Sequence, residues 1–222
     1  LSADVNDIIF TSGSTESINI ALLGTALNLK PGRIILSSIE HPAVNYSANI
    51  LKSKGWDVGY WPVDKKGHLN ISYISELISP PTKILSLIWA QSEIGTIQSF
   101  GKISEICRKN RVVFHTDATQ YIPHFKIKWK ELPFDLLSFS GHKLQGPKGI
   151  GVLLRRNQNN YQLSNIFGGG SQEFGLRPGT EPIELVGGLA VALDILYKDF
   201  NSESTYNLSE KAKVYSMTKK LL

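Results

Sequence analysis

The sequence has very little cysteine and methionine, with one of each in 222 residues. The single thiol, Cys107, excludes a disulfide within the chain and is compatible with a reducing compartment. Long hydrophobic runs are absent too: the apolar stretch Ile84–Ala90 is interrupted by Ser86 and is far shorter than the ~20 residues that cross a bilayer. No signal-peptide pattern opens the sequence. We therefore expect a cytoplasmic protein without membrane attachment.

Clustered positive charge is a third absence. The net charge of +5 arises from 24 basic and 19 acidic residues that are spread along the chain. Nucleic-acid binding usually requires a stripe or patch of Lys and Arg, which this sequence lacks. We therefore expect no direct nucleic-acid ligand, and we expect no metal centre.

Strand-like and helix-like segments alternate along the chain. With 41% hydrophobic residues, a chain of this length can bury a full core in one large domain. Short runs rich in Val, Ile, Leu and Phe, bounded by Gly or Pro, predict buried strands. The predicted strand and helix pairs are Ile8–Thr11 with Glu16–Leu27, Arg33–Ser38 with Ala43–Lys54, Val58–Val63 with Ile71–Ile78, and Lys83–Ala90 with Lys102–Asn110.

Three more predicted strands complete a sheet. Arg111–Thr116 precedes Leu136–Ser140, and Gly149–Arg155 follows so closely that an antiparallel return is favoured. The alternation predicts an α/β fold with a mostly parallel (mixed) sheet and helices on both faces. Asn157–Asn160 and Asn201–Thr205 are predicted polar connections, and Leu208–Leu222 is a predicted final helix.

Lys143 follows the predicted strand at Leu136–Ser140 after only Gly141 and His142. Ligands of open α/β sheets bind beyond the carboxyl ends of the strands. A buried amine there can form a Schiff base with a carbonyl compound such as pyridoxal phosphate. The plain alternative is a surface lysine after a strand.

The segment TSGSTES, Thr11–Ser17, opens a predicted helix. Its backbone N–H groups and the hydroxyls of Ser14 and Thr15 are suited to hold a phosphate against the positive end of the helix. A simple capping box explains this segment alone equally well.

Two more candidate residues follow strands. Asp117, in HTDATQ, could keep a cofactor's pyridine nitrogen protonated, or could cap the following turn. His41, in EHPAV, could lie on an aromatic cofactor and exchange protons with a substrate, although a lone histidine is more often structural. The glycine-rich segment Gly168–Glu181 could approach an anion or another subunit, or could simply be flexible.

Six segments, in order, resemble those of the cysteine desulfurases, within the class V aminotransferase-like group of pyridoxal-phosphate enzymes. They are TSGSTES, EHPAV, SEIGTIQ, HTDATQ, DLLSFSGHKLQGPKGIG and GGGSQEFGLRPGTE, and the resemblance runs from about Asp7 to Leu193. Each segment alone would mislead, but their combination in this order is highly specific. The resemblance implies the large domain of a fold-type-I PLP-dependent transferase.

The resemblance also implies roles for matching residues. Lys143 would bind pyridoxal 5'-phosphate covalently, and His41 would stack on the ring and act in catalysis. Asp117 would pair with the pyridine nitrogen, and Gln120 with the ring hydroxyl. The phosphate would be held by Ser14, Thr15, Ser140 and His142, and by Thr180 from the other subunit of a homodimer.

In the implied reaction, L-cysteine is converted to L-alanine while an enzyme cysteine takes the sulfur as a persulfide. Gly168–Gly170 resembles most the branch that serves iron–sulfur cluster assembly and thiolation, so a sulfur-acceptor or scaffold protein is an expected partner. The chain is expected to be a fragment. Residues 1–200 would form the large domain without its opening segment, and residues 201–222 a connecting helix toward a small C-terminal domain that the chain lacks.

Two features depart from the family pattern. Ser92 stands where the family usually has an asparagine that contacts the ring hydroxyl. Cys107 shares helical spacing with Ile103 and Ile106, which favours a buried core thiol over the sulfur acceptor. A selenocysteine lyase, another class V aminotransferase-like enzyme, or a non-catalytic homologue acting as a dimerisation module therefore remain alternatives.

Overall fold

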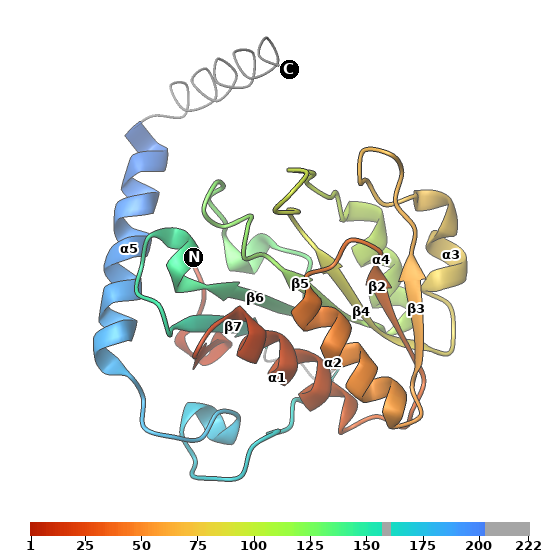
Figure 1. Cartoon of the computed structure of the whole chain (residues 1–222), viewed down its shortest axis with the longest axis horizontal. Coiled ribbons are helices and arrows are strands. Elements are labelled where there is room, and N and C mark those ends of the chain that lie inside the picture. Colours follow the sequence, from red (N-terminus) through yellow and green to blue (C-terminus); the bar gives the residue numbers. More distant parts are fainter. Residues whose placement is uncertain (157–160, 203–222) are drawn as a thin grey trace.

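A seven-stranded sheet forms the centre of the computed structural model, which describes residues 1–156 and 161–202 (Figure 1). The strand order is β1-β7-β6-β5-β4-β2-β3. Only β7 runs against its two neighbours, and the other adjacent pairs are parallel. The predicted mixed sheet and antiparallel return are thus confirmed. The strands are β1 (Ile8–Thr11), β2 (Arg33–Ser37), β3 (Asp57–Trp61), β4 (Thr82–Ile88), β5 (Val113–Asp117), β6 (Leu136–Ser140) and β7 (Gly151–Arg155).

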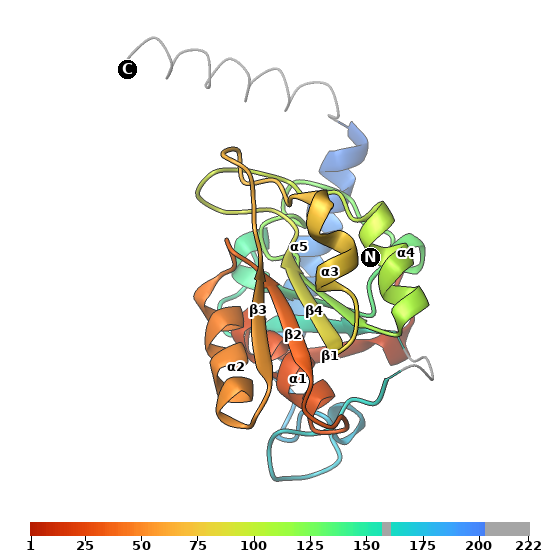
Figure 2. The same ribbon diagram turned by 90° about the vertical axis from the view of Figure 1, so that its right-hand side faces the viewer.

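Helices cover both faces of the sheet, as the alternation predicts. Helices α1 (Ser14–Ala26) and α2 (Pro42–Ser53) lie on one face, and α3 (Ile74–Leu77) and α4 (Gly101–Asn110) on the other (Figure 2). Alternate residues of a strand point to opposite faces. In β2, Ile34 and Leu36 pack with α1 and α2, whereas Ile35 belongs to the core cluster on the other face, which includes side chains of α4. Because both faces are covered, the central strands are apolar on both sides.

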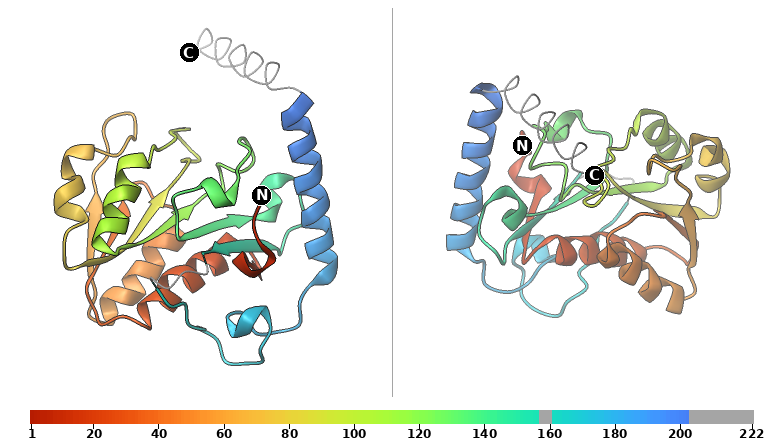
Figure 3. Two further views of the ribbon diagram at one scale, coloured as in Figure 1. Left: turned by 180° about the vertical axis from the view of Figure 1, so that it is seen from behind. Right: turned by 45° about the horizontal axis from the view of Figure 1, so that its top comes forward.

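The last described helix, α5 (Ile183–Ser202), flanks the end of the sheet that carries β7 (Figure 3). Its Leu189 is buried beside Ile150 and Leu144, in the same core cluster as α4. The sequence pattern did not predict α5. Asn201, expected in a polar connection, lies within this helix, and the predictions for 157–160 and 208–222 fall outside the described residues.

Local backbone geometry shifts several predicted boundaries. Arg111 adopts a left-handed conformation, φ 56°, and ends α4, so β5 starts at Val113 and not at Arg111. The predicted helix over 71–78 is only a 3-10 turn, Ile71–Tyr73, followed by the single turn of α3. This segment is mostly exposed, so little apolar burial extends the helix.

Parallel strands bring their carboxyl ends to one edge of the sheet. The ends of β2, β4, β5 and β6 and the start of α1 meet there. Among the described residues, no helix combines the length and the hydropathy needed to cross a membrane.

Candidate active site

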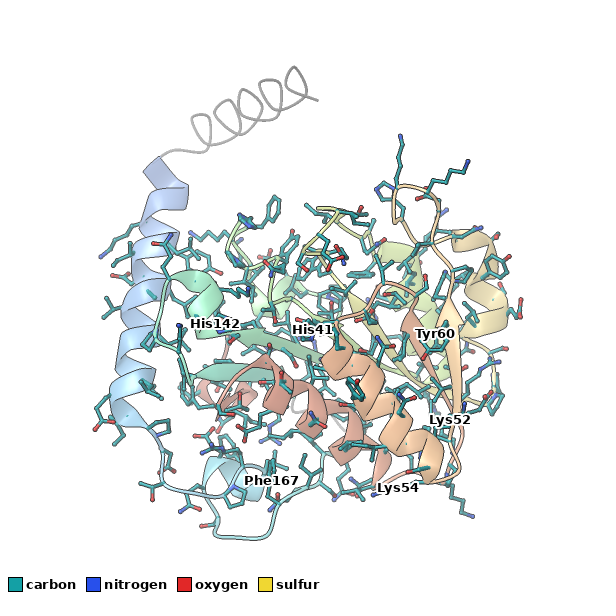
Figure 4. All side chains as sticks on the ribbon, in the orientation of Figure 1. His41, Lys52, Lys54, Tyr60, His142 and Phe167 are labelled. Atoms are coloured by element: carbon teal, nitrogen blue, oxygen red, sulfur yellow. The ribbon has the colours of Figure 1, made fainter. Side chains whose placement is uncertain are left out.

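A cavity of about 720 Å³ opens at this edge of the sheet. Figure 4 shows His41 at the start of α2 and His142 beside the end of β6, both on the side of the molecule away from Phe167. The cavity combines groups from five segments that are distant in the sequence. Its lining includes Ser14, Thr15, His41, Asp117, Gln120, His142 and Lys143, all of which the sequence analysis named.

Asp117 is the buried acid of the cavity. It ends β5, its side chain is 4% exposed, and its Oδ1 accepts a hydrogen bond from the Thr119 N–H at 2.9 Å. Burial raises the pKa of Asp117, against the opposing hydrogen bonds from Thr119 and the weaker electrostatic effect of His41. A cationic group that binds beside Asp117 would therefore favour its ionised form.

His41 is exposed and is held by the start of α2. Its Nδ1 accepts a hydrogen bond from the Ala43 N–H at 3.2 Å, which caps the helix, and Pro42 occupies the first helical turn. An accepting Nδ1 leaves Nε2 to carry the proton of the neutral ring. The imidazole is therefore oriented by the backbone while it lines the cavity.

The start of α1 lies beside a second, smaller cavity of about 420 Å³. Gly13 occupies the cap position and offers no side chain to accept from the first-turn N–H groups. Ser14, Thr15 and His142 line both cavities, and Ser140 lines the smaller one. The Ser140 hydroxyl and His142 Nδ1 are 2.7 Å apart, so these two side chains hold each other in place.

Lys143 lies in the short 3-10 turn Gly141–Leu144 that follows β6. It lines the main cavity, but it is exposed. The expectation of a buried amine is therefore wrong for this chain, because the cavity beside Lys143 is open to solvent. The position at the carboxyl end of β6 is the predicted one.

Gln91 and Ser92 lie on the loop after β4. The Gln91 Oε1 accepts from the N–H groups of Glu93 at 2.6 Å and Ile94 at 2.9 Å, so its carboxamide oxygen stabilises the turn. Ser92 is exposed and lines the cavity. The residue that departs from the family pattern therefore lies at the cavity.

The glycine-rich segment 168–181 is fixed to the start of α1. Arg177 forms a 2.9 Å ion pair with Glu16, whose Oε2 accepts from the Ser12 N–H. Burial alone would raise the pKa of Glu16, but the hydrogen bonds from Arg177 and Ser12 outweigh it and lower the pKa. Thr180 is exposed and lines neither of the two cavities in this chain.

Cys107 is 2% exposed and lies on α4, in the same core cluster as Ile103 and Phe114. Burial raises the pKa of its thiol. A buried neutral thiol is a poor nucleophile. The expectation of a core cysteine is confirmed.

Glu40 is a lining residue that the sequence analysis missed. It is 9% exposed and its Oε1 accepts from the Ile88 N–H at 2.6 Å and from the Ser37 hydroxyl at 2.5 Å. The available signal was an acidic residue between an apolar strand and a candidate histidine. Among the described residues, no group of three or more side chains suited to hold a metal ion comes together.

This fold, with a lysine, an aspartate and a helix start around one cavity, is that of the class V aminotransferases. The family model described as aminotransferase class-V matches residues 1–221, and the chain belongs to this family. Curated relatives are named as cysteine desulfurases. They include the probable mitochondrial cysteine desulfurase of Dictyostelium discoideum, 39% identical over 93% of this chain and 46% of the relative. Another is the cysteine desulfurase IscS of Buchnera aphidicola subsp. Baizongia pistaciae, 41% identical over 92% of this chain and 51% of the relative.

Solved structures agree with the predicted fold. A structure named NifS-like protein superposes with a TM-score of 0.90 and 33% identity, over 97% of this chain and 60% of that one. A structure named SspA in complex with cysteine gives a TM-score of 0.80 and 38% identity, over 85% of this chain and 55% of that one. The chain thus spans about half the length of the curated relatives it matches.

Proposed function

We propose that the protein containing this chain is a PLP-dependent cysteine desulfurase, which converts L-cysteine to L-alanine and passes the sulfur to a thiol. The observation that supports this function best is the main cavity, where Lys143, Asp117 and His41 meet the start of α1. The names of the relatives and the cysteine complex of the SspA structure support the substrate.

The side chains fit pyridoxal 5'-phosphate. The cofactor has an aldehyde, a pyridine nitrogen and a phosphate, and the cavity offers an amine, a buried carboxyl group and a helix start without a side-chain cap. When bound, pyridoxal phosphate supplies an electron sink that stabilises negative charge at the substrate α-carbon.

Lys143 and Asp117 would bind two different groups of the cofactor, the aldehyde and the pyridine nitrogen. Lys143 Nζ would be the amine that holds the cofactor aldehyde, and it lines the same cavity that would admit the amino group of L-cysteine. Asp117, with one oxygen occupied by the Thr119 N–H, holds a proton on the pyridine nitrogen. Ionic pairing there is strong because Asp117 is buried.

His41 and Gln120 contact the ring in this proposal. His41 stacks on the ring, and its Nε2 exchanges a proton with the substrate while Nδ1 remains bound to the start of α2. Gln120 is partly buried, lines the cavity and binds the ring hydroxyl. The Ser92 hydroxyl is too short to replace an asparagine directly and would act there through a water molecule.

The phosphate is held by Ser14, Thr15, Ser140 and His142 in the cradle at the start of α1. This end of the helix carries partial positive charge, which stabilises an anion. Thr180 completes the cradle of a second copy of the chain, so the protein is a homodimer. The Arg177 ion pair with Glu16 sets the path of the loop that carries Thr180.

The sulfur acceptor is a thiol other than Cys107. The C–S bond of L-cysteine breaks, a thiol R–SH becomes R–S–SH, and the β-carbon gains a proton to give L-alanine, which balances the reaction. Cys107 is unsuited because it is buried in the core. The acceptor is then a cysteine of the small domain expected to follow residues 201–222, or of a partner protein in the cytoplasm that builds iron–sulfur clusters.

The reaction is tested by incubating the protein with pyridoxal phosphate, L-cysteine and a thiol reductant, and measuring L-alanine and sulfide. We expect both products in equal amounts from the wild type and at least ~100-fold less from Lys143→Ala. Intact-mass analysis should show no persulfide on Cys107. Absence of alanine from cofactor-loaded protein, or a persulfide on Cys107, would contradict this function or this acceptor, respectively.

A further inference from the structure

Glu40 is a buried acid of the main cavity that the proposed chemistry leaves without a role. It follows β2 and immediately precedes His41. Both of its side-chain hydrogen bonds are made by one oxygen, Oε1, which accepts from the Ile88 N–H at 2.6 Å and from the Ser37 hydroxyl at 2.5 Å. Within the described part of the chain, the other oxygen, Oε2, is buried and has no hydrogen-bond partner.

This asymmetry distinguishes the two protonation states. An ionised carboxylate shares its charge between two acceptor oxygens, and a buried oxygen without donors then carries the full desolvation cost. A neutral carboxyl group has one carbonyl oxygen, which accepts, and one O–H group, whose burial without a partner costs far less than burial of an ionised oxygen. The arrangement at Glu40 matches the neutral form, with the proton on Oε2.

The surroundings of Glu40 favour the same state. The charged or titratable side chains that line this cavity with it are His41, Glu93, Asp117, His142 and Lys143. Burial is the main cause that raises the pKa of Glu40 to about 8, and Asp117 raises it further, against the opposing hydrogen bonds from Ser37 and Ile88. Two acids that interact within one cavity do not both ionise easily.

We propose that Glu40 is a positioning residue that keeps its proton at neutral pH and ties the carboxyl ends of β2 and β4 together beside Asp117. The bond to the Ile88 N–H fixes the end of β4, and the bond to the Ser37 hydroxyl fixes the turn that presents His41. With Glu40 neutral, Asp117 is the one acid of the pair that ionises. The statement about Asp117 rests on the proposed function, because Asp117 is the acid that would pair with the pyridine nitrogen. The statement that Glu40 is protonated is independent of the proposed function.

The protonation is tested without cofactor, by comparing the wild type with Glu40→Gln. Glutamine retains a carbonyl acceptor for Ile88 and Ser37 but cannot ionise. In the wild type, Glu40 has a raised pKa in the folded state, so its contribution to stability is lost as the pH rises from its unfolded value toward about 8. We therefore expect the unfolding temperature of the wild type to fall relative to that of Glu40→Gln as the pH rises. The difference between the two proteins should change by on the order of 5 °C between about pH 6 and about pH 8.

A matched control removes another carboxyl group from the same cavity. Glu93 also lines it but is exposed, so Glu93→Gln should leave the pH dependence of the unfolding temperature unchanged. Difference infrared spectra at neutral pH should show a protonated carboxyl band that Glu40→Gln removes and Glu93→Gln retains. A constant difference between Glu40→Gln and the wild type over this range, or no such band, would show that Glu40 is ionised and would overturn the inference.

The link to Asp117 is read from the bound cofactor. Its absorbance should titrate in the wild type near the same pH at which stability changes, and this step should be absent in Glu40→Gln. Glu40→Gln keeps both hydrogen bonds and should show, at every pH, the cofactor spectrum that the wild type has at low pH. Glu40→Ala loses the bonds to both strands and should not show this spectrum. A protein that binds no pyridoxal phosphate would contradict the proposed function, while the cofactor-free measurements would still decide the state of Glu40.

Discussion

At the scale of single residues, the proposed chemistry depends on the position of Lys143 at the carboxyl end of β6. The residue is exposed in the turn after β6 and lines the cavity. In the function we propose, its reactivity toward an aldehyde would come from proximity, because a phosphate at the start of α1 and a ring beside Asp117 would place the reacting carbon near this amine.

Covalent labelling tests this assignment. After borohydride reduction of the protein with pyridoxal phosphate, we expect a stable label on Lys143, located by peptide mapping. Lys143→Ala should lose the label yet retain some cofactor through the phosphate contacts. Lys102→Ala is a suitable control, because this exposed lysine lies on α4, outside the cavity lining. Labelling of a different lysine in the wild type would contradict the assignment.

At the scale of elements, the close approach of β7 and the start of α1 shapes the smaller cavity, which we propose as the phosphate site. Gly151 lies opposite Thr11 on β1 and Ser140 on β6. A Cβ atom at Gly151 would come within 2.5 Å of the Gly13 backbone. Only glycine at this position lets the strand support the turn that begins α1.

Gly151→Ala should therefore displace the start of α1. We expect a loss of about 1–3 kcal/mol in the free energy of unfolding, together with weaker binding of pyridoxal phosphate. Urea unfolding and cofactor titration measure the two effects. Gly187→Ala is the control, since nothing lies within 4 Å of its Cβ position on α5, and alanine there should stabilise the helix by up to about 1 kcal/mol. If Gly151→Ala and Gly187→Ala had equal stability and equal cofactor affinity, the close approach of β7 would not be needed to place the start of α1.

At the scale of the whole molecule, the exposed Thr180 is the residue that we propose for the phosphate site of a second copy of the chain. Its loop is anchored to α1 by the 2.9 Å ion pair between Arg177 and Glu16, and Glu173 accepts from the Phe10 N–H on β1. These contacts hold the loop against the domain while Thr180 remains exposed.

Cofactor retention should consequently depend on protein concentration. We expect dilution to release pyridoxal phosphate as dimers dissociate, and Thr180→Ala to weaken retention roughly 10–150-fold through the loss of one hydrogen bond to a charged group. Thr180→Ser keeps the hydroxyl and should behave as the wild type. Sedimentation and absorbance on the same samples provide the measurement. Retention that is equal in all three proteins and independent of concentration would remove Thr180 from the site.

Much of the fold could be predicted because hydrophobic alternation and strand ends are local signals. The strands before Ser14, His41, Asp117 and Lys143 were predicted from such runs, and parallel pairing then brings their ends to one edge. The short 3-10 turn at Ile71–Tyr73 and the start of β5 were misplaced, because a few backbone dihedral angles and limited burial decide them.

The sequence by itself determined the family, the order of the seven strands along the chain, and most of the candidate side chains at strand ends, since Glu40 was missed. The tertiary structure alone decided the environment of two of them: Lys143 is exposed, and Glu40 joins the carboxyl ends of β2 and β4. The physical reason is that burial and hydrogen-bond partners depend on residues distant in the chain. The bond between Glu40 and the Ile88 N–H spans 48 residues, and no local pattern specifies it.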